Sequence, residues 1–127
     1  MKPRFINIPN IYTDNLYLVR ARNRLELLKA VNKKLNVEID LRDEEEDRTS
    51  CGSFYAVEDR KSTMRFYLWI DNKGTKKYRF ATIVHESAHA TYQILRHVGI
   101  ELKWPTEEAY TYLQEDIIRK VSNILIK

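Results

Sequence analysis

The stretch that most constrains this chain is Phe80–Val98, which carries the pattern H-E-x-x-H at His85, Glu86 and His89. Two histidines four residues apart on a helix lie one turn apart on the same face. Their imidazole nitrogens can therefore reach one metal ion, and the glutamate beside the first histidine can hold a metal-bound water. The alternative is a pair of histidines that hydrogen-bond to the backbone on a partly buried face, but it gives Glu86 no role. The spacing thus predicts a helix with His85 and His89 as zinc ligands.

A third ligand has to come from elsewhere, because a catalytic zinc usually has three protein ligands and one open position. His97 is eight residues past His89, which corresponds to about 12 Å along a helix axis. That distance is too great for both side chains to share one ion. We expect His97 instead to lie in the last helical turn, where the helix dipole favours a cation.

Two carboxylates at the start of a final predicted helix are the remaining candidates, Glu107 and Glu108. The preceding helix is expected to end near Val98, and residues 99–105 can span roughly 23 Å when extended. The chain can therefore double back and place the final helix beside the two histidines. We prefer Glu108 as the third ligand, because Ala109 after it is small enough to let the two helices touch. Glu107 stays open as a replacement, and both glutamates would also complement the N-terminal helix dipole.

Length and composition indicate one ordinary domain, expected to cover residues 1–127. Of the 127 residues, 43% are hydrophobic and 31% are charged, which is typical of a globular protein with a single core. No apolar run approaches the roughly 20 residues of a membrane span, and the N-terminus lacks the apolar region of a secretory signal. The single cysteine, Cys51, cannot form an internal disulfide. We therefore expect a cytoplasmic protein in which Cys51 is an ordinary loop or strand-edge residue rather than a nucleophile or ligand.

The N-terminal third predicts two short strands followed by a helix. The strands are expected near Ile11–Tyr12 and Leu16–Val19, joined by a tight turn. After Asn23, apolar residues recur every three or four positions, which is the helical period. Asn23 is expected to cap this helix and Lys33-Lys34 to lie at its C-terminal end. Its leucine-rich face should pack on the sheet.

The remainder predicts a hairpin and two helices. Residues 53–57 and 64–71 are expected to be strands joined by a polar turn. The long helix should begin within Thr75–Tyr78 and end with a left-handed C-cap at Gly99. A final helix should be capped by Thr106 and should bury one apolar stripe. That stripe comprises Ala109, Leu113, Ile117, Val121 and Ile124.

Charge is unevenly distributed around a net value of +4. The acidic run Asp43–Asp47 is expected to be solvated rather than to bind a metal or a basic partner, because adjacent carboxylates repel each other. A basic cluster precedes the long helix and consists of Lys73, Lys76, Lys77 and Arg79. This balance permits anionic partners, nucleic acid among them, without demanding one.

These motifs resemble the gluzincin branch of zinc metallopeptidases, in which H-E-x-x-H is followed by a glutamate ligand on a downstream helix. Here Glu108 lies 19 positions after His89, a short gap that falls within that pattern. The chain is also similar to small phage- and prophage-encoded proteins of metallopeptidase type. This likeness covers most of the chain and is most specific between residues 83 and 113. Its shared positions are Ile8-Pro9, Val84–Ala90, Ile94-Leu95, Val98–Ile100 and Glu108–Tyr112.

The resemblance implies an α+β, zincin-like fold, with a small mixed or antiparallel sheet packed on an N-terminal helix, the H-E-x-x-H helix and a C-terminal helix. It implies a zinc metallopeptidase in which Zn2+ is bound by His85, His89 and Glu108 and the substrate is a peptide or protein. Glu86 would act as general base on the zinc-bound water and then deliver the proton to the leaving amine. Tyr112, one turn after Glu108, is the first candidate for the oxyanion donor. Its alternative roles are packing between helices or a hydrogen bond to a ligand.

The aromatic strand at 64–71 resembles the edge strand that borders a zincin cleft, where a peptide could pair with the exposed edge. Its side chains alternate, with Tyr67 and Trp69 on one face and Phe66 and Leu68 on the other. At least one of these two sets must be core.

Two other functions are compatible with the same residues. The first is a metal-binding module of a phage or mobile element that does not cleave, although a purely structural site needs no general base such as Glu86. The second is a DNA-associated protease resembling the SprT-like group, in which the basic cluster would hold DNA phosphates. That group commonly uses a third histidine, and this chain offers none within reach. In a phage-encoded protein, the expected compartment is the host cytoplasm.

Overall fold

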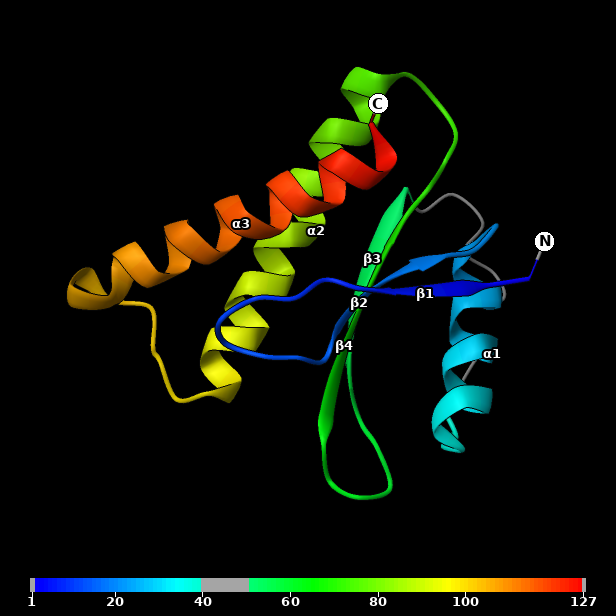
Figure 1. Cartoon of the computed structure of the whole chain (residues 1–127), viewed down its shortest axis with the longest axis horizontal. Coiled ribbons are helices and arrows are strands. Elements are labelled where there is room, and N and C mark those ends of the chain that lie inside the picture. The colour runs from blue at the N-terminus through cyan, green and yellow to red at the C-terminus, as the bar shows by residue number, and fades with distance from the viewer. Residues whose placement is uncertain (1, 40–50, 127) are drawn as a thin grey trace.

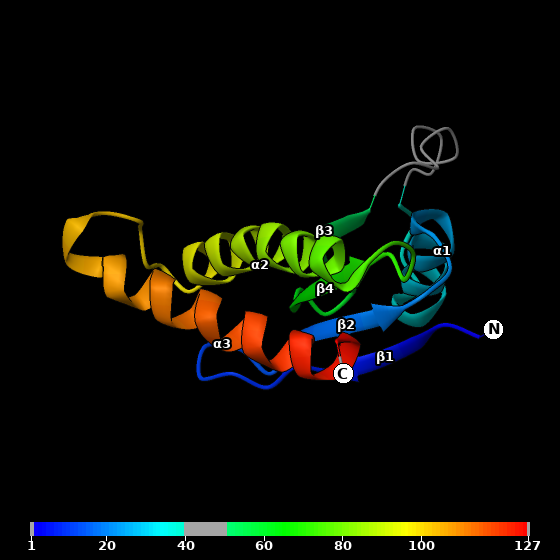
Figure 2. The same cartoon turned by 90° about the horizontal axis from the view of Figure 1, so that it is seen from above.

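The computed structural model describes residues 2–39 and 51–126, so the acidic run Asp43–Asp47 lies outside the described residues. Over this part, the chain forms a mixed α+β fold with a four-stranded sheet and three α-helices, which confirms the predicted class. Helix α1 covers one face of the sheet, and α2 and α3 cover the other (Figures 1 and 2). In chain order the elements are β1 (Arg4–Asn7), β2 (Leu16–Arg20), α1 (Arg24–Leu35), β3 (Gly52–Glu58), β4 (Met64–Ile70), α2 (Lys76–His97), the 3-10 turn η1 (Trp104–Thr106) and α3 (Glu107–Leu125).

The sheet has the strand order β1-β2-β4-β3, with β2 and β4 parallel and the other two pairs antiparallel. The predicted hairpin is confirmed, because Phe54 pairs with Leu68 in the β3–β4 ladder. The prediction that the aromatic strand lies at the edge of the sheet is wrong. Strand β4 is internal and pairs on both sides, with β2 and with β3. Among the described strands, β3 and β1 form the edges.

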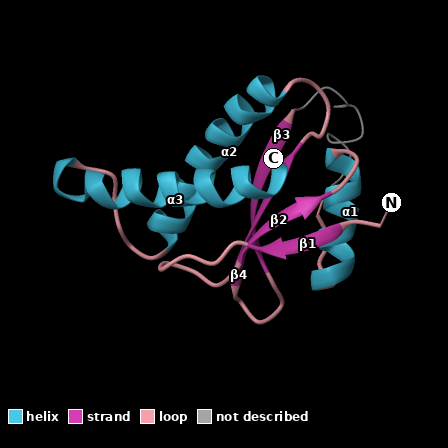
Figure 3. Ribbon diagram, turned by 45° about the horizontal axis from the view of Figure 1, so that its top comes forward, coloured by secondary structure: helices cyan, strands magenta, loops and turns pink. Residues whose placement is uncertain are grey.

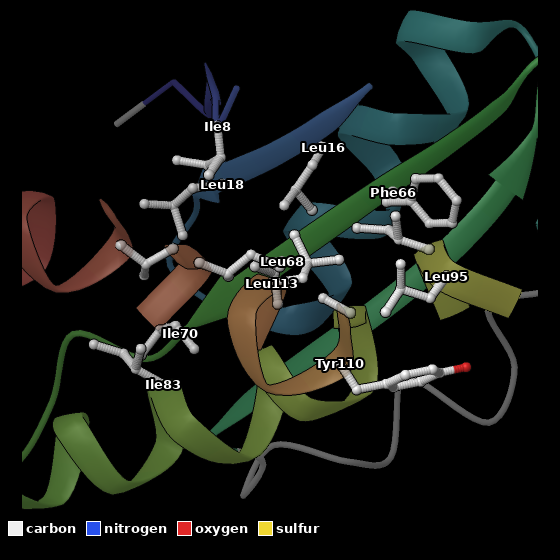
Figure 4. Close-up of a cluster of buried hydrophobic side chains, with 14 residues drawn as sticks. Ile8, Leu16, Leu18, Phe66, Leu68, Ile70, Ile83, Leu95, Tyr110 and Leu113 are labelled. Atoms are coloured by element: carbon white, nitrogen blue, oxygen red, sulfur yellow. The ribbon is translucent and has the colours of Figure 1, made fainter. Parts of the chain in front are cut away.

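Both faces of β4 are apolar, and each face is covered by helices (Figure 3). Tyr67 and Trp69 pack towards α1 in one buried cluster that includes Leu27 and Val31. The alternate residues of β4 face α2 and α3 in a second, larger cluster (Figure 4). That second cluster includes Leu16, Leu18, Phe66, Leu68, Ile70, Ile83, Ile94, Leu95, Leu113 and Ile117. A strand that is buried on both faces has a continuous apolar sequence. Such a sequence does not show which strands lie on either side of it.

The strand predicted near Ile11–Tyr12 is wrong, and β1 lies earlier, before Pro9. The physical reason is a local turn at Asn10. Its side-chain oxygen accepts hydrogen bonds from the backbone N–H of Tyr12 and of Thr13, each at 3.0 Å. An asparagine that bonds its own downstream backbone holds the chain in a turn rather than a strand.

The first two helices begin and end as predicted. Asn23 caps α1 by accepting a hydrogen bond from the Glu26 N–H at 2.8 Å. Thr75 caps α2 in the same way, through the Tyr78 N–H. Gly99 has a positive φ of 86° just after α2, as a left-handed helix end requires.

Helix α3 also agrees with its predicted range, but its capping differs. Thr106 makes no side-chain capping bond to α3, because its hydroxyl instead contacts the carbonyl oxygens of Glu101 and Lys103. The buried residues of α3 are Tyr110, Leu113, Ile117 and Val121. No helix in the described part of the chain is long and apolar enough to cross a membrane.

Replacing Trp69 by Phe tests the α1 side of the core. The buried Trp69 indole N–H donates to the Ala21 carbonyl oxygen at 2.9 Å. Because the variant leaves that buried carbonyl without this donor, we expect the free energy of unfolding to fall by about 1–3 kcal/mol, measured by urea denaturation. The matched control is Trp104→Phe at a position that is 87% exposed, with an expected change within about 0.5 kcal/mol. Equal losses in the two variants would contradict this role of Trp69.

Candidate metal centre

The two histidines of the H-E-x-x-H pattern face each other on α2. The Nε2 atoms of His85 and His89 are 3.3 Å apart, and the rings meet edge to face with centroids 4.9 Å apart. Both side chains are exposed, and that of His85 is 69% accessible. They lie on the face of α2 opposite the buried stripe that contains Ile83, Ala90 and Ile94. The structure thus brings together the two histidines that the spacing predicted to share one face of the helix.

This arrangement has the geometry of half a zinc site. For a tetrahedral zinc with Zn–N bonds of about 2.0–2.1 Å, two ligand nitrogens lie about 3.3–3.4 Å apart. The Nε2 separation of His85 and His89 in the structure is 3.3 Å. The same distance permits an N–H···N hydrogen bond between two neutral rings. The pair therefore fits a metal, and a measurement of bound metal distinguishes the two arrangements.

Glu86 lies beside the two histidines on α2 but, unlike them, is buried. It is 7% exposed, and one of its carboxylate oxygens lies 4.0 Å from His85 Nε2. Burial raises the pKa of Glu86, and the neighbouring His85 and His89 partly offset that rise. A buried carboxyl group with a raised pKa beside two imidazoles is a candidate general base.

The burial of Glu86 depends on Gly52, the first residue of β3. A Cβ added at Gly52 would lie 2.7 Å from Thr82 Cγ2, 2.9 Å from the Trp69 carbonyl oxygen and 3.0 Å from Glu86 Cγ. The missing side chain therefore lets α2 approach the end of β3 closely. A close approach of this kind is a usual reason for glycine within a strand.

A groove of about 420 Å³ runs along β3 next to the histidine helix. Its lining residues are Arg24, Gly52, Ser53, Phe54, Tyr55, Glu86, His89 and Gln93. Phe54 packs in the cluster on the α2 side of the sheet, whereas Tyr55 packs in the cluster on the α1 side. The groove therefore includes residues from both faces and follows the outer edge of β3.

Glu108, the predicted third ligand, is not brought to the histidines. It is exposed in the first turn of α3, and the start of α3 projects away from α2 (Figures 1 and 2). Glu107 is exposed in the same turn. Within residues 2–39 and 51–126, no three His, Cys, Asp or Glu side chains form a group that could hold a metal. The connection between α2 and α3 is long enough to bring Glu108 back to the histidines. Its length alone does not determine where the start of α3 lies in space.

Tyr112, the predicted oxyanion donor, lines a different groove. That groove has a volume of about 300 Å³ and contains no residue of α2. Tyr112 lies there beside the loop Pro9–Tyr12 and near Asp116 and Lys120. The structure therefore gives Tyr112 no contact with the candidate metal centre.

The other candidate residues lie apart from the histidine pair. His97 is in the last turn of α2, as expected, with its ring edge-on to Phe66 at 5.9 Å. Cys51 directly precedes β3, and its Sγ lies 3.0 Å from the Tyr78 hydroxyl. Of the basic cluster, the three lysines are exposed, with Lys73 in the loop before α2 and Lys76 and Lys77 in its first turn. Arg79 donates to the Leu125 carbonyl oxygen.

Sequence reasoning missed the residues of the groove, namely Arg24, Gly52, Ser53 and Gln93. Gly52 carried a usable signal, because an isolated glycine at a strand end often marks a close backbone approach. Arg24, Ser53 and Gln93 carried no such signal in the sequence, because they line the groove only if β3 is the edge strand.

The chain matches no protein-family model, no curated protein and no solved structure. Its function therefore has to be inferred from the site itself. The features that bear on function are the facing imidazoles, the buried carboxylate beside them and the groove along β3.

Replacing Glu86 by Gln in chelator-treated protein tests the burial of the carboxylate. Because the pKa of Glu86 is raised in the folded state, its favourable contribution is complete below the unfolded pKa and is lost as the pH rises through the folded pKa. We expect Glu86→Gln to unfold at a higher temperature than the wild type at pH 7. The difference should vanish below about pH 4.

The control is Glu115→Gln, at an exposed position of α3, which reports the general effect of losing one negative charge. A Glu86→Gln variant that is less stable than the wild type at pH 7 would show that the carboxylate forms favourable interactions there.

Proposed function

We propose that this protein is a zinc-dependent peptidase with a zincin-like arrangement of its active site. The observation that carries the proposal is the 3.3 Å separation of the His85 and His89 Nε2 atoms with the buried carboxylate of Glu86 beside them. A purely structural zinc site is usually closed by four side chains and needs no general base. An exposed histidine pair with a neighbouring buried glutamate is instead suited to hydrolysis.

Each residue has a distinct role in this proposal. His85 and His89 hold the metal, which when bound supplies a Lewis acid and lowers the pKa of water towards ~7. Glu86 accepts a proton from the attacking water and then donates it to the leaving amine. Burial raises the pKa of Glu86, which makes its carboxylate a stronger base than one that is fully solvated.

The edge of β3 is the proposed binding site for the peptide. Asp71 donates its backbone N–H to the Cys51 carbonyl at 2.7 Å, which makes these two residues a hydrogen-bonded pair next to the β3–β4 ladder. Because antiparallel pairs alternate, the backbone groups of Gly52 and Phe54 point towards the outer edge. An extended peptide could pair with them and pass Glu86 and His89, which line the same groove.

The two competing functions differ from this proposal in what they require. A metal-binding module that does not cleave would need the histidine pair alone, and the buried Glu86 would then have no chemical purpose. A DNA-associated protease would use the exposed lysines at the start of α2. None of those lysines lines the groove beside Glu86, so the site geometry itself does not favour that function.

Zinc binding and proteolysis test the proposal together. The wild type should bind zinc, measured by elemental analysis after dialysis, and should cleave unfolded casein or a mixed peptide library. Glu86→Gln should retain zinc while kcat/KM falls by at least ~100-fold, because it removes the general base. His85→Ala should lose the zinc.

The remaining outcomes distinguish the alternatives. Stoichiometric zinc with no cleavage of any substrate would identify a binding module. No zinc, with His85→Ala unchanged in stability in the presence of zinc, would exclude the metal centre. A salt-dependent shift of DNA mobility would support the DNA-associated protease.

The third ligand can be identified by comparing adjacent glutamates. We retain Glu108 as the proposed ligand, which requires the start of α3 to come closer to the histidines when zinc binds. Glu108→Ala should then weaken zinc binding by more than tenfold, measured by competition with a chromogenic chelator. Glu107→Ala is the matched control and should change affinity little. The reverse result would identify Glu107 as the third ligand. If neither variant changes the zinc affinity, neither glutamate is a ligand, and His85 and His89 remain the proposed ligands.

A further inference from the structure

The two sides of the β3 groove differ in chemistry. Glu86 and His89 lie on the α2 side, whereas Arg24, Ser53 and Tyr55 line the α1 side. Side chains of an extended peptide alternate, so every second side chain would point to the α1 side. We propose that the α1 side is a subsite for an acidic side chain, so that the groove takes peptides with Asp or Glu next to the residue that faces Glu86. This inference rests on the proposed function, because it names the substrate class of the same groove.

Arg24 is the group that would recognise the carboxylate. It is the first residue of α1 and follows the N-cap Asn23, so the start of the helix fixes its backbone. The residue is half-buried, and part of its guanidinium is shielded from water. Arg24 already takes part in an interaction within the protein, but a guanidinium has five N–H donors and can hold a further acceptor. A planar guanidinium binds a carboxylate through two parallel hydrogen bonds.

Ser53 gives an independent indication of a polar ligand on this side. The residue is 8% exposed, and its hydroxyl has no hydrogen-bond partner among the described residues. Buried hydroxyls are normally paired. Ser53 lines the groove together with Arg24, so an acceptor bound there could satisfy the hydroxyl and the guanidinium at once.

The charges that face the groove also set the register. Among the described residues, the groove is lined by one carboxylate, Glu86, and one imidazole, His89, and both lie on the α2 side. An acidic side chain on the α2 side would meet the carboxylate of Glu86 and be repelled. The same side chain on the α1 side would meet Arg24. The groove therefore selects both an acidic residue and its position relative to Glu86.

Peptide binding without metal tests this subsite. Fluorescein-labelled peptides of threonine and valine would carry one Asp at each position in turn, and a matched set would carry Asn instead. Their binding to the full chain in EDTA is measured by fluorescence anisotropy. We expect the best Asp peptide to bind about tenfold more tightly than its Asn counterpart.

Substitutions then assign the preference to residues. Arg24→Gln should remove the preference by weakening only the Asp peptides, Arg24→Lys should retain part of it, and Ser53→Ala should reduce it by a smaller factor. The matched control is Arg22→Gln, because Arg22 is exposed, pairs with Glu26 and does not line the groove. Circular dichroism confirms that each variant is folded.

Equal binding of Asp and Asn peptides, a preference that survives in Arg24→Gln, or no binding at all would overturn the inference. Its failure is distinct from that of the proposed function, because the assay contains no zinc. A chain that prefers acidic peptides but never cleaves them would retain the subsite and overturn the peptidase. A chain that cleaves peptides with no acidic preference would do the opposite.

Discussion

Burial of β4 on both faces is the constraint on which the rest of this structure depends. Tyr67 and Trp69 pack towards α1, and Phe66, Leu68 and Ile70 pack towards α2 and α3. A strand with two apolar faces has to be covered on both sides, and it is most fully buried with a strand on each flank. Strand β3 flanks β4 and lies at the edge of the sheet, so the groove beside the histidine helix forms along β3 rather than along β4.

The second important contact is the close approach of α2 to the start of β3. Gly52 leaves room for Thr82 and Glu86, so the carboxylate is buried while the neighbouring histidines stay exposed. One helix thus presents two different environments within five residues. Dry surroundings suit a base with a raised pKa, and an open position suits a metal that has to accept water and substrate.

Local patterns in the sequence predicted local structure well. The cap at Asn23, the start of α2 within Thr75–Tyr78 and the positive φ at Gly99 follow from short-range hydrogen bonding and sterics, which neighbouring residues determine. The histidine pair was predictable for the same reason, because four residues of helix fix its geometry. The error at Ile11–Tyr12 came from β propensity, which the turn at Asn10 overrides.

By itself, the sequence determined the helices, the hairpin and the His85–Glu86–His89 constellation, because each depends on residues within a few turns of one another. Only the tertiary structure decided which strand is the edge, that Glu86 is buried against Gly52, and that Arg24 and Ser53 share a groove with it. It also placed Glu108 and Tyr112 away from the histidines. These arrangements join residues far apart in the chain. Their positions depend on how the helices pack on the sheet. A long connecting segment allows a helix to lie in many places and does not select one of them.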